Sequence, residues 1–244
     1  MGQKFASYNA QSAITGYYDS VDSPVPAGVT AIEISVSQWQ ACLAGGNGYA
    51  VVNGALVAPA APTALDLLAA AQASQTTLVS NACANAITSG FNSSALGVTY
   101  TYPSQPADQA NLSASVLAAL LAQGSAVTYV PGMQATARMI VSAGGQLYSC
   151  SVAGPTGTTE PVWPTAAGQL ANDGGAQWEL WTTPFWCESG AGVWAFMNHT
   201  APQIMAVGQA GKQAILANMA INVSLAAQIA EAENVAAVQA IAWP

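Results

Sequence analysis

Aromatic side chains gather between residues 126 and 181 together with carboxylates and amides, and this combination is suited to binding sugars. Sugars present apolar C–H faces, on which exposed Trp or Tyr rings stack, and a rim of hydroxyls that polar side chains bond. Trp163 stands between prolines in a predicted loop, which favours exposure. Tyr148 and Trp178 have a competing interpretation, as the core of a small β domain. The candidate carbohydrate-binding residues are Tyr129, Tyr148, Trp163, Asp173, Trp178 and Trp181.

Carboxylates in the same stretch raise a catalytic alternative. Glu160, Asp173 and Glu179 are the residue types that act as acid and nucleophile in glycosidases. Their spacing does not fix any distance between carboxyl groups, and the rest of a glycosidase cleft is missing. A Ser–His–Asp arrangement would need His199, the single histidine, which stands at a predicted helix start and favours a structural contact. We therefore expect a protein that is not an enzyme.

Metal and cofactor ligands are sparse. The four cysteines are far apart in the chain, without a C-x-x-C pair, at Cys42, Cys83, Cys150 and Cys187. A zinc site would have to gather ligands from four distant places, so we expect buried free thiols. A Cys150–Cys187 disulfide is the alternative, although cytosolic synthesis argues against it. No metal and no cofactor is expected.

The composition excludes several classes of function. The chain has 244 residues and a formal net charge of −8, with 3 Lys+Arg and 11 Asp+Glu. Three cations cannot neutralise a run of phosphates, so sequence-independent nucleic-acid binding is excluded. The apolar content comes largely from Ala mixed with polar residues, and no signal-peptide core is present, so we expect cytosolic synthesis and no membrane insertion.

Cap and turn signals predict an α+β chain. Ser35 and Thr63 are predicted helix N-caps, and Asn53-Gly54 predicts a type I′ hairpin. Helices are expected over 63–90, from Asp108 to Gly124, from His199 to Asn222 and again from Ser224 to Ile229. The expected organisation is a small β-rich N-terminal module at 1–62, a helical scaffold at 63–125 and 182–244, and a β module inserted at 126–181.

The insertion carries a topological expectation. Helix-rich sequence stands on both sides of the β module, so the strand near Tyr100 is expected to meet those near Trp186 and Trp194. Gly208 and Gly211 predict a helix that packs closely against a neighbour. Helices 63–90 and 203–232 are expected to pack within one chain or around a threefold axis. We expect a homo-oligomer with a trimer favoured, the alternative being a monomeric helical domain.

Three motif groups resemble known families. The first resembles a domain of unknown function from bacteriophage tail-fibre proteins, in Gly90-Phe91, Ser94–Gly97, Tyr100–Tyr102, Asp108–Leu112 and Trp194–Ile204. The second resembles the start of tail-fibre assembly proteins, in Gly16–Asp19, Ile32–Ile34 and Trp39-Gln40. The third is similar to chitinase-type carbohydrate-binding modules, in Tyr129–Gly132, Gly145–Cys150, Pro161–Pro164 and Asp173–Trp178. The third departs from related modules at Arg138-Met139, where they often carry a Gly and a small residue.

These resemblances imply a function. They imply a structural tail protein, a fibre or fibre-attachment or tip component, which is made in the host bacterial cytoplasm and located in the virion tail. Its expected partners are other phage tail or baseplate proteins, further copies of itself and host envelope polysaccharide, reached through the inserted module. The alternative is a tail-fibre assembly chaperone that is not retained in the mature virion.

Overall fold

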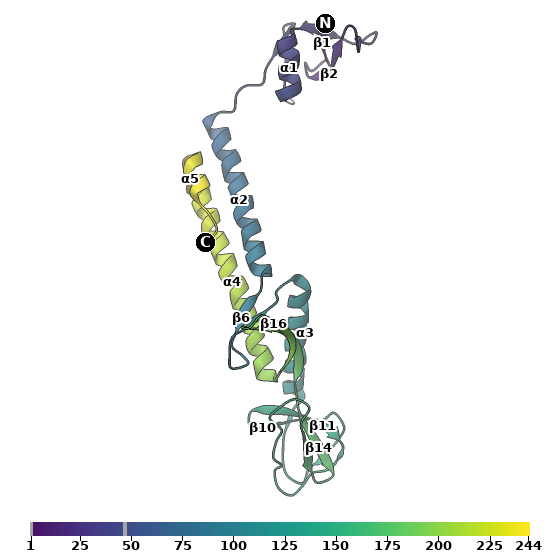
Figure 1. The fold of residues 1–244 in the computed structure, drawn as a ribbon, viewed down its shortest axis with the longest axis vertical. Helices are drawn as coiled ribbons and strands as arrows, with labels where there is room; N and C mark the ends of the chain where they lie inside the picture. The colour runs from purple at the N-terminus through teal and green to yellow at the C-terminus, as the bar shows by residue number, and fades with distance from the viewer. Residues whose placement is uncertain (1, 46–47) are drawn as a thin grey trace. The chain divides into compact units, whose positions relative to one another are not determined.

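The computed structural model describes residues 2–45 and 48–244, in two compact units that divide between Leu67 and Leu68. Helices and several small sheets occur together, which confirms the α+β class. The ribbon is drawn in Figure 1. Each unit is described by itself below.

The first unit is a three-stranded antiparallel sheet with one helix and a hairpin. Its order is β2 (Ile14–Asp19), β1 (Lys4–Tyr8) and β3 (Ala31–Ile34). Ser35 caps α1 (Val36–Gly45) as predicted, because its Oγ accepts from the Gln38 amide at 3.1 Å. The predicted hairpin is confirmed: β4 (Ala50–Val52) and β5 (Ala55–Val57) flank Asn53 and Gly54, both at positive φ.

Three long helices dominate the second unit: α2 (Ala64–Thr88), α3 (Pro106–Ser125) and α4 (Ala201–Glu231). The predicted cap of α2 is confirmed, since Thr63 Oγ1 accepts from the Asp66 amide at 3.1 Å. Two predictions were wrong in detail. Helix α3 begins at Pro106, because Gln105 is the N-cap and Asp108 bonds back to its amide. Helix α4 runs unbroken through residue 223, since no Gly or Pro interrupts it after Gly211.

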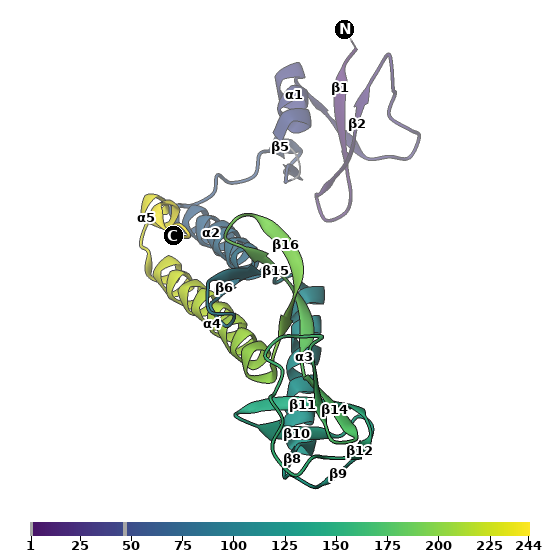
Figure 2. The ribbon, with the colours of Figure 1, turned by 60° about the horizontal axis from the view of Figure 1, so that its bottom comes forward.

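Helices α2 and α4 run antiparallel, side by side in both ribbon views (Figures 1 and 2). The Gln72 amide donates to the carbonyl of Ile229 at 3.0 Å, and the Cys83 thiol reaches the carbonyl of Asn218 at the other end. The short helix α5 (Val235–Ala240) follows α4. A small core of Val79, Ile229 and Val238 joins these three helices.

A four-stranded antiparallel sheet lies against α3 and α4. Its order is β16 (Val193–His199), β15 (Thr183–Ser189), β7 (Tyr100–Tyr102) and β6 (Phe91–Ser93). Strand β7 pairs with β15, which confirms the expected meeting of chain segments on either side of the insertion. One face of the sheet forms the main core with the helices, from Phe91, Tyr102, Leu112, Phe185, Cys187, Ile204 and Val207.

The chain between α3 and β15 forms a separate sheet with its own core (Figure 2). Its order is β13 (Leu170–Asp173), β14 (Ala176–Leu180), β11 (Gln146–Val152), β10 (Ile140–Ala143) and β8 (Val127–Thr128). A two-stranded ladder of β9 (Gln134–Ala135) and β12 (Gly154–Pro155) completes it. We call residues 126–181 the β module.

Candidate functional site

Four of the candidate sugar-binding rings interlock in the β module. Trp163 stacks on Tyr148 with ring centroids 4.2 Å apart and planes 25° from parallel. The Tyr129 ring meets Trp163 edge-on at 4.9 Å and Trp178 edge-on at 6.2 Å. Tyr129, Tyr148 and Trp178 are buried, and Trp163 is half-buried. The faces and edges of these rings pack against one another, so the four rings form the core of the module.

Asp173 is the polar centre of this core. Its Oδ2 accepts from the Tyr129 hydroxyl at 3.0 Å and from Trp178 Nε1 at 2.8 Å. Its Oδ1 accepts from the Gly157 amide at 2.7 Å. Burial, and then the bond to Asp173, raises the pKa of Tyr129 to about 12, so its hydroxyl remains a donor. Both carboxylate oxygens are engaged inside the module.

The glycines after Asp173 bring two backbone segments into contact. Gly174 has a positive φ of 61°, and a Cβ there would lie 2.8 Å from the amide nitrogen of Gly157. A Cβ on Gly154 would lie 2.4 Å from the carbonyl oxygen of Gly175. Arg138 also has a positive φ, a backbone conformation that favours Gly. The motif therefore specifies tight turns as much as binding chemistry.

Trp181 and the remaining carboxylates lie apart from this cluster. Trp181 packs half-buried against the main helical core. Glu160 is exposed and its Oε1 accepts from Trp163 Nε1 at 2.6 Å, while Glu179 is half-buried on β14. Over residues 2–45 and 48–244, no cluster of three His, Cys, Asp or Glu side chains is placed to hold a metal ion. All four cysteines are buried free thiols, as predicted.

His199 joins the two motif segments on either side of the β module. It is fully buried, its Nδ1 donates to the Met197 carbonyl at 2.8 Å, and its Nε2 accepts from the Tyr102 hydroxyl at 2.9 Å. Burial lowers the pKa of His199 and raises that of Tyr102, so the imidazole is neutral and the phenol remains a donor. The structural contact expected for this histidine is confirmed.

We expect this histidine to make the protein less stable as the pH falls from 7.5 to 5.5. The unfolded chain takes up a proton near pH 6.5 and the folded chain resists it, so the free energy of unfolding decreases by up to about 1.4 kcal/mol per pH unit. The loss ends below the folded pKa. Thermal unfolding measures it, and His199→Asn should flatten the dependence. A wild-type melting temperature that is constant over this range would contradict it.

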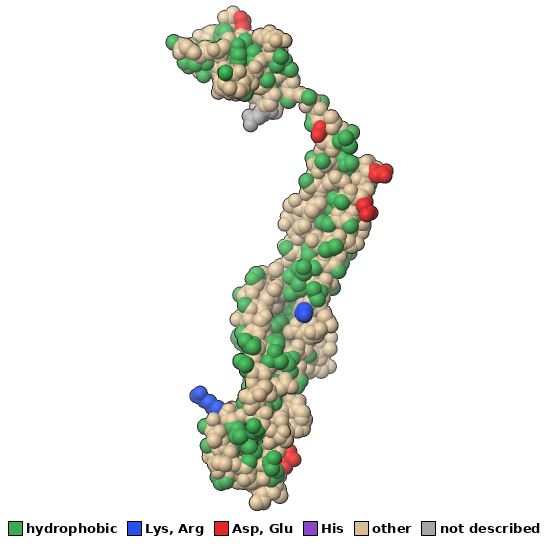
Figure 3. All heavy atoms as spheres, turned by 180° about the vertical axis from the view of Figure 1, so that it is seen from behind, with side chains coloured by type: hydrophobic (Ala, Val, Ile, Leu, Met, Phe, Trp, Pro, Cys, Tyr) green, Lys and Arg blue, Asp and Glu red, His purple; other side chains and the backbone are tan. Residues whose placement is uncertain are grey.

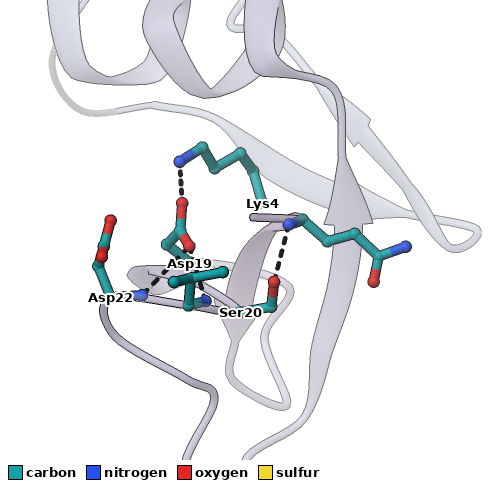
Figure 4. Close-up of polar contacts among 6 residues, drawn as sticks. Lys4, Asp19, Ser20 and Asp22 are labelled. Atoms are coloured by element: carbon teal, nitrogen blue, oxygen red, sulfur yellow. Dashed lines mark hydrogen bonds and ion pairs between the residues drawn. The ribbon is translucent and has the colours of Figure 1, made fainter. Parts of the chain in front are cut away.

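In the first unit, the charge of Lys4 is balanced by neighbouring side chains. Lys4 pairs with Asp19, and its Nζ lies 4.5 Å from the centroid of the Trp39 ring. Asp19 Oδ1 also accepts from the amides of Val21 at 2.8 Å and Asp22 at 3.3 Å (Figure 4). The Lys4 bond and these amides lower the pKa of Asp19 to about 2. Lys4 is therefore satisfied within the unit.

An apolar groove of about 520 Å³ runs between α3 and α4. Gly208 and Gly211 allow the walls of this groove to approach closely. A Cβ on Gly208 would lie 2.7 Å from Val116, and a Cβ on Gly211 would lie 2.9 Å from Phe91. This confirms the close packing predicted for the two glycines. Lys212 is the only charged residue among those that line the groove. Exposed apolar side chains along it are Leu117, Leu120 and Leu216.

The sequence analysis missed an exposed aromatic surface on β15 and β16. Trp186, Trp194 and Phe196 are 40%, 41% and 68% exposed. Period-two alternation with Phe185 and Cys187, which are buried, is the signal that separates the two faces of β15. We call Trp186, Trp194 and Phe196 the aromatic face.

Comparison of the chain with protein-family models, with curated proteins and with solved structures found no match. By length and composition alone, α4 is apolar enough to cross a membrane, with a mean hydropathy of 1.3 over its best window. Only 11% of that window is buried within the chain. Few residues of this apolar window are therefore fully buried within the chain.

Proposed function

We propose that this protein is a structural component of a bacteriophage tail, a tail fibre or a fibre-attachment or tip protein, assembled from several copies of the chain. The uncovered apolar surface of α4 carries the assembly part of this proposal. Leu216, Met219 and Val223 are exposed along it, and Leu216 lines the groove together with Leu117 and Leu120 of α3. Such a row of large apolar side chains is typical of an interface rather than of a free surface.

A lipid bilayer is the less suitable cover for α4. Polar side chains recur along the whole helix, among them Gln209, Lys212, Asn218 and Gln228. Each would lose its water in hydrocarbon, at a cost of several kcal/mol where no partner replaces it. A protein interface tolerates such side chains at its rim. We therefore assign α4 to contacts between copies, with a trimer as the favoured assembly.

The tail assignment comes from the motif resemblance and is supported by what the motif residues do. Phe91, Tyr102 and Leu112 from the first segment share one core with Ile204 from the second. His199 and Tyr102 bond across the insertion. Because the two segments complete one domain, the β module is carried as an addition that is free to serve a separate contact. We assign it to the host envelope polysaccharide, as its resemblance to carbohydrate-binding modules implies.

The charge of the surface suits such a particle. Charged residues are only 6% of the chain, and few charged side chains interrupt the face drawn in Figure 3. Small uncharged side chains lose little conformational entropy and little hydration when copies pack together. The net charge of −8 also opposes nucleic-acid binding. We propose no enzymatic activity.

Two lysines placed on α4 should break the assembly. Leu216 and Met219 are about half exposed, and burying two charges in an apolar interface costs several kcal/mol for each ion. We expect size-exclusion chromatography with light scattering to give three times the chain mass of 24.6 kDa for the wild type. For Leu216→Lys/Met219→Lys we expect the mass of one chain. Val162→Lys is the control, since Val162 is 93% exposed in the β module. A monomeric wild type would refute the assembly.

Mass spectrometry of purified phage particles tests the tail assignment itself. We expect the chain at a few to a few dozen copies, measured against the major tail protein. Absence from particles, with presence in infected-cell lysate bound to a fibre protein, would replace this proposal with the assembly chaperone. The assembly chaperone is the alternative because the first unit resembles the start of tail-fibre assembly proteins.

A further inference from the structure

The outer face of the four-stranded sheet is uncovered within the second unit. The register places Trp186 opposite Phe196 and Glu188 opposite Trp194. Cys187 and Phe185, on the opposite face of β15, are buried in the main core with α4. Since alternate residues point to opposite faces, the three aromatic rings stand on one surface, anchored by strands whose other side is packed. The aromatic face is thus held in place before any ligand binds.

The rings are arranged as a platform. Trp186 and Trp194 lie with centroids 6.2 Å apart and planes 19° from parallel. Phe196 meets Trp186 edge-on, with centroids 4.9 Å apart. The two indoles stack on each other and each remains about 40% exposed, so the stack presents apolar surface that water solvates poorly.

Uncharged hydrogen-bonding groups border the platform. The register continues the row of Glu188 through Thr101 to Asn92, and the Thr101 hydroxyl donates to Asn92 Oδ1 at 3.1 Å. Asn198 lies at the other end of β16 and is exposed. Over the described residues, no protein group bonds the Asn198 side chain. The amides of Asn92 and Asn198 are left to donate and accept, as a ligand rich in hydroxyls requires.

We propose that the aromatic face is a binding site for neutral glycans built from β-linked glucopyranose or N-acetylglucosamine units. These sugars carry their ring substituents equatorially, so both faces of each ring are apolar and lie flat on an aromatic ring. Their hydroxyls reach the amides at the border. Glu188 is the charged residue of the row, and the chain carries −8, so polyanionic glycans are repelled. The inference requires neither the tail assignment nor sugar binding by the β module.

A second copy of this chain is the competing occupant. The α3–α4 groove and the exposed row on α4 are apolar surfaces without the polar border of the aromatic face, and we assign contacts between copies to them. The two occupants predict different measurements, so one set of variants separates them.

Isothermal titration calorimetry of the full chain with cellohexaose and with chitohexaose tests the proposal. We expect saturable binding of at least one of them, and none of polygalacturonate. Trp186→Ala and Trp194→Ala should each weaken binding at least tenfold, whereas Trp194→Phe keeps most of it. Val162→Ala, at a fully exposed side chain of the β module, should leave it unchanged. Circular dichroism checks that the variants fold. We expect them to fold because both tryptophans are exposed.

Three results would overturn the proposal. The first is no saturable binding of either neutral probe to the wild type at millimolar concentration. The second is binding that survives in both alanine variants, which would move the site away from the aromatic face. The third is a smaller assembly mass for Trp186→Ala and Trp194→Ala in light scattering without glycan binding, which would assign the face to a second copy.

Discussion

Asp173→Ala is expected to unfold the β module while the helices remain folded. The substitution takes the acceptor away from the Tyr129 hydroxyl, the Trp178 indole and the Gly157 amide. Each buried donor left without a partner costs about 1–3 kcal/mol, and we expect a total loss of about 3–5 kcal/mol in the free energy of unfolding of the module. Asp173→Asn keeps one acceptor oxygen and should cost less, about 1–3 kcal/mol.

Hydrogen exchange resolved by residue measures this loss in each part of the chain. Amides in β11, β13 and β14 should lose protection, and those in the middle of α4 should keep it. Asn172→Ala is the matched control, because Asn172 is the exposed residue that precedes Asp173 on the same strand. Its side chain accepts a hydrogen bond from the side chain of Gln177 and takes no part in the core. We expect it to change stability by less than about 0.5 kcal/mol. Equal effects of the two alanine variants would show that Asp173 does not hold the core together.

Local signals predicted the elements well because each depends on a few neighbouring residues. Asn53-Gly54 made its hairpin because both residues accept positive φ. Ser35 and Thr63 capped their helices because their side-chain oxygens reach amides three residues on. The pairing of β7 with β15 followed from the insertion, which obliges its two flanks to lie together. Such signals need no knowledge of distant packing.

The candidate sugar site could not be predicted from residue types, because the same rings serve a small core. A module of about 55 residues has little apolar surface to bury, so it uses large aromatic rings and one buried carboxylate. Trp163 lies between prolines, which suggested a free loop, and yet it stacks on Tyr148. Whether a ring faces outward depends on long-range contacts, and these do not appear in a window of sequence.

The aromatic face was missed for a related reason. Phe185 to Cys187 alternate between the two faces of β15, but both faces carry large side chains, so composition does not separate inside from outside. The pairing of β15 with β16, and the packing of the opposite side of β15 on α4, determine which side chains face outward. The continuity of α4 was missed because Val223-Ser224 are weak helix formers, and packing with α2 outweighs that preference.

Gly208 and Gly211 connect the main core to the groove that we assign to assembly. Gly211 faces Phe91, which stacks on Tyr102, and Tyr102 bonds His199. A change at Gly211 therefore acts on the contact that joins the two motif segments. Tyr129, Tyr148 and Trp178 form a second core inside the β module, although Leu147 of the module belongs to the main core. A substitution at Gly211 should therefore act mainly on the main core.

Gly211→Ala is expected to destabilise the second unit although alanine is the better helix former. A Cβ at this position would lie 2.9 Å from Cζ of Phe91, whose ring is buried in the main core, so the ring or the helix must shift. Overpacking costs about 1–3 kcal/mol, and the helix preference returns about 0.5–1 kcal/mol, so we expect a net loss of about 1–2 kcal/mol. Gly211→Leu should cost about 3 kcal/mol. Urea unfolding followed by the circular dichroism of the helices measures both.

Gly124→Ala, the same substitution at another helical glycine, is expected to increase the free energy of unfolding rather than decrease it. Gly124 lies in α3 with open space where its Cβ would stand, so only the helix preference acts and we expect a gain of about 0.5–1 kcal/mol. Opposite signs at two helical glycines would isolate the contact with Phe91 as the cause. A gain at both positions would mean that α4 can move away from the sheet at little cost. The contact between Gly211 and Phe91 would then not determine how closely α4 packs against β6.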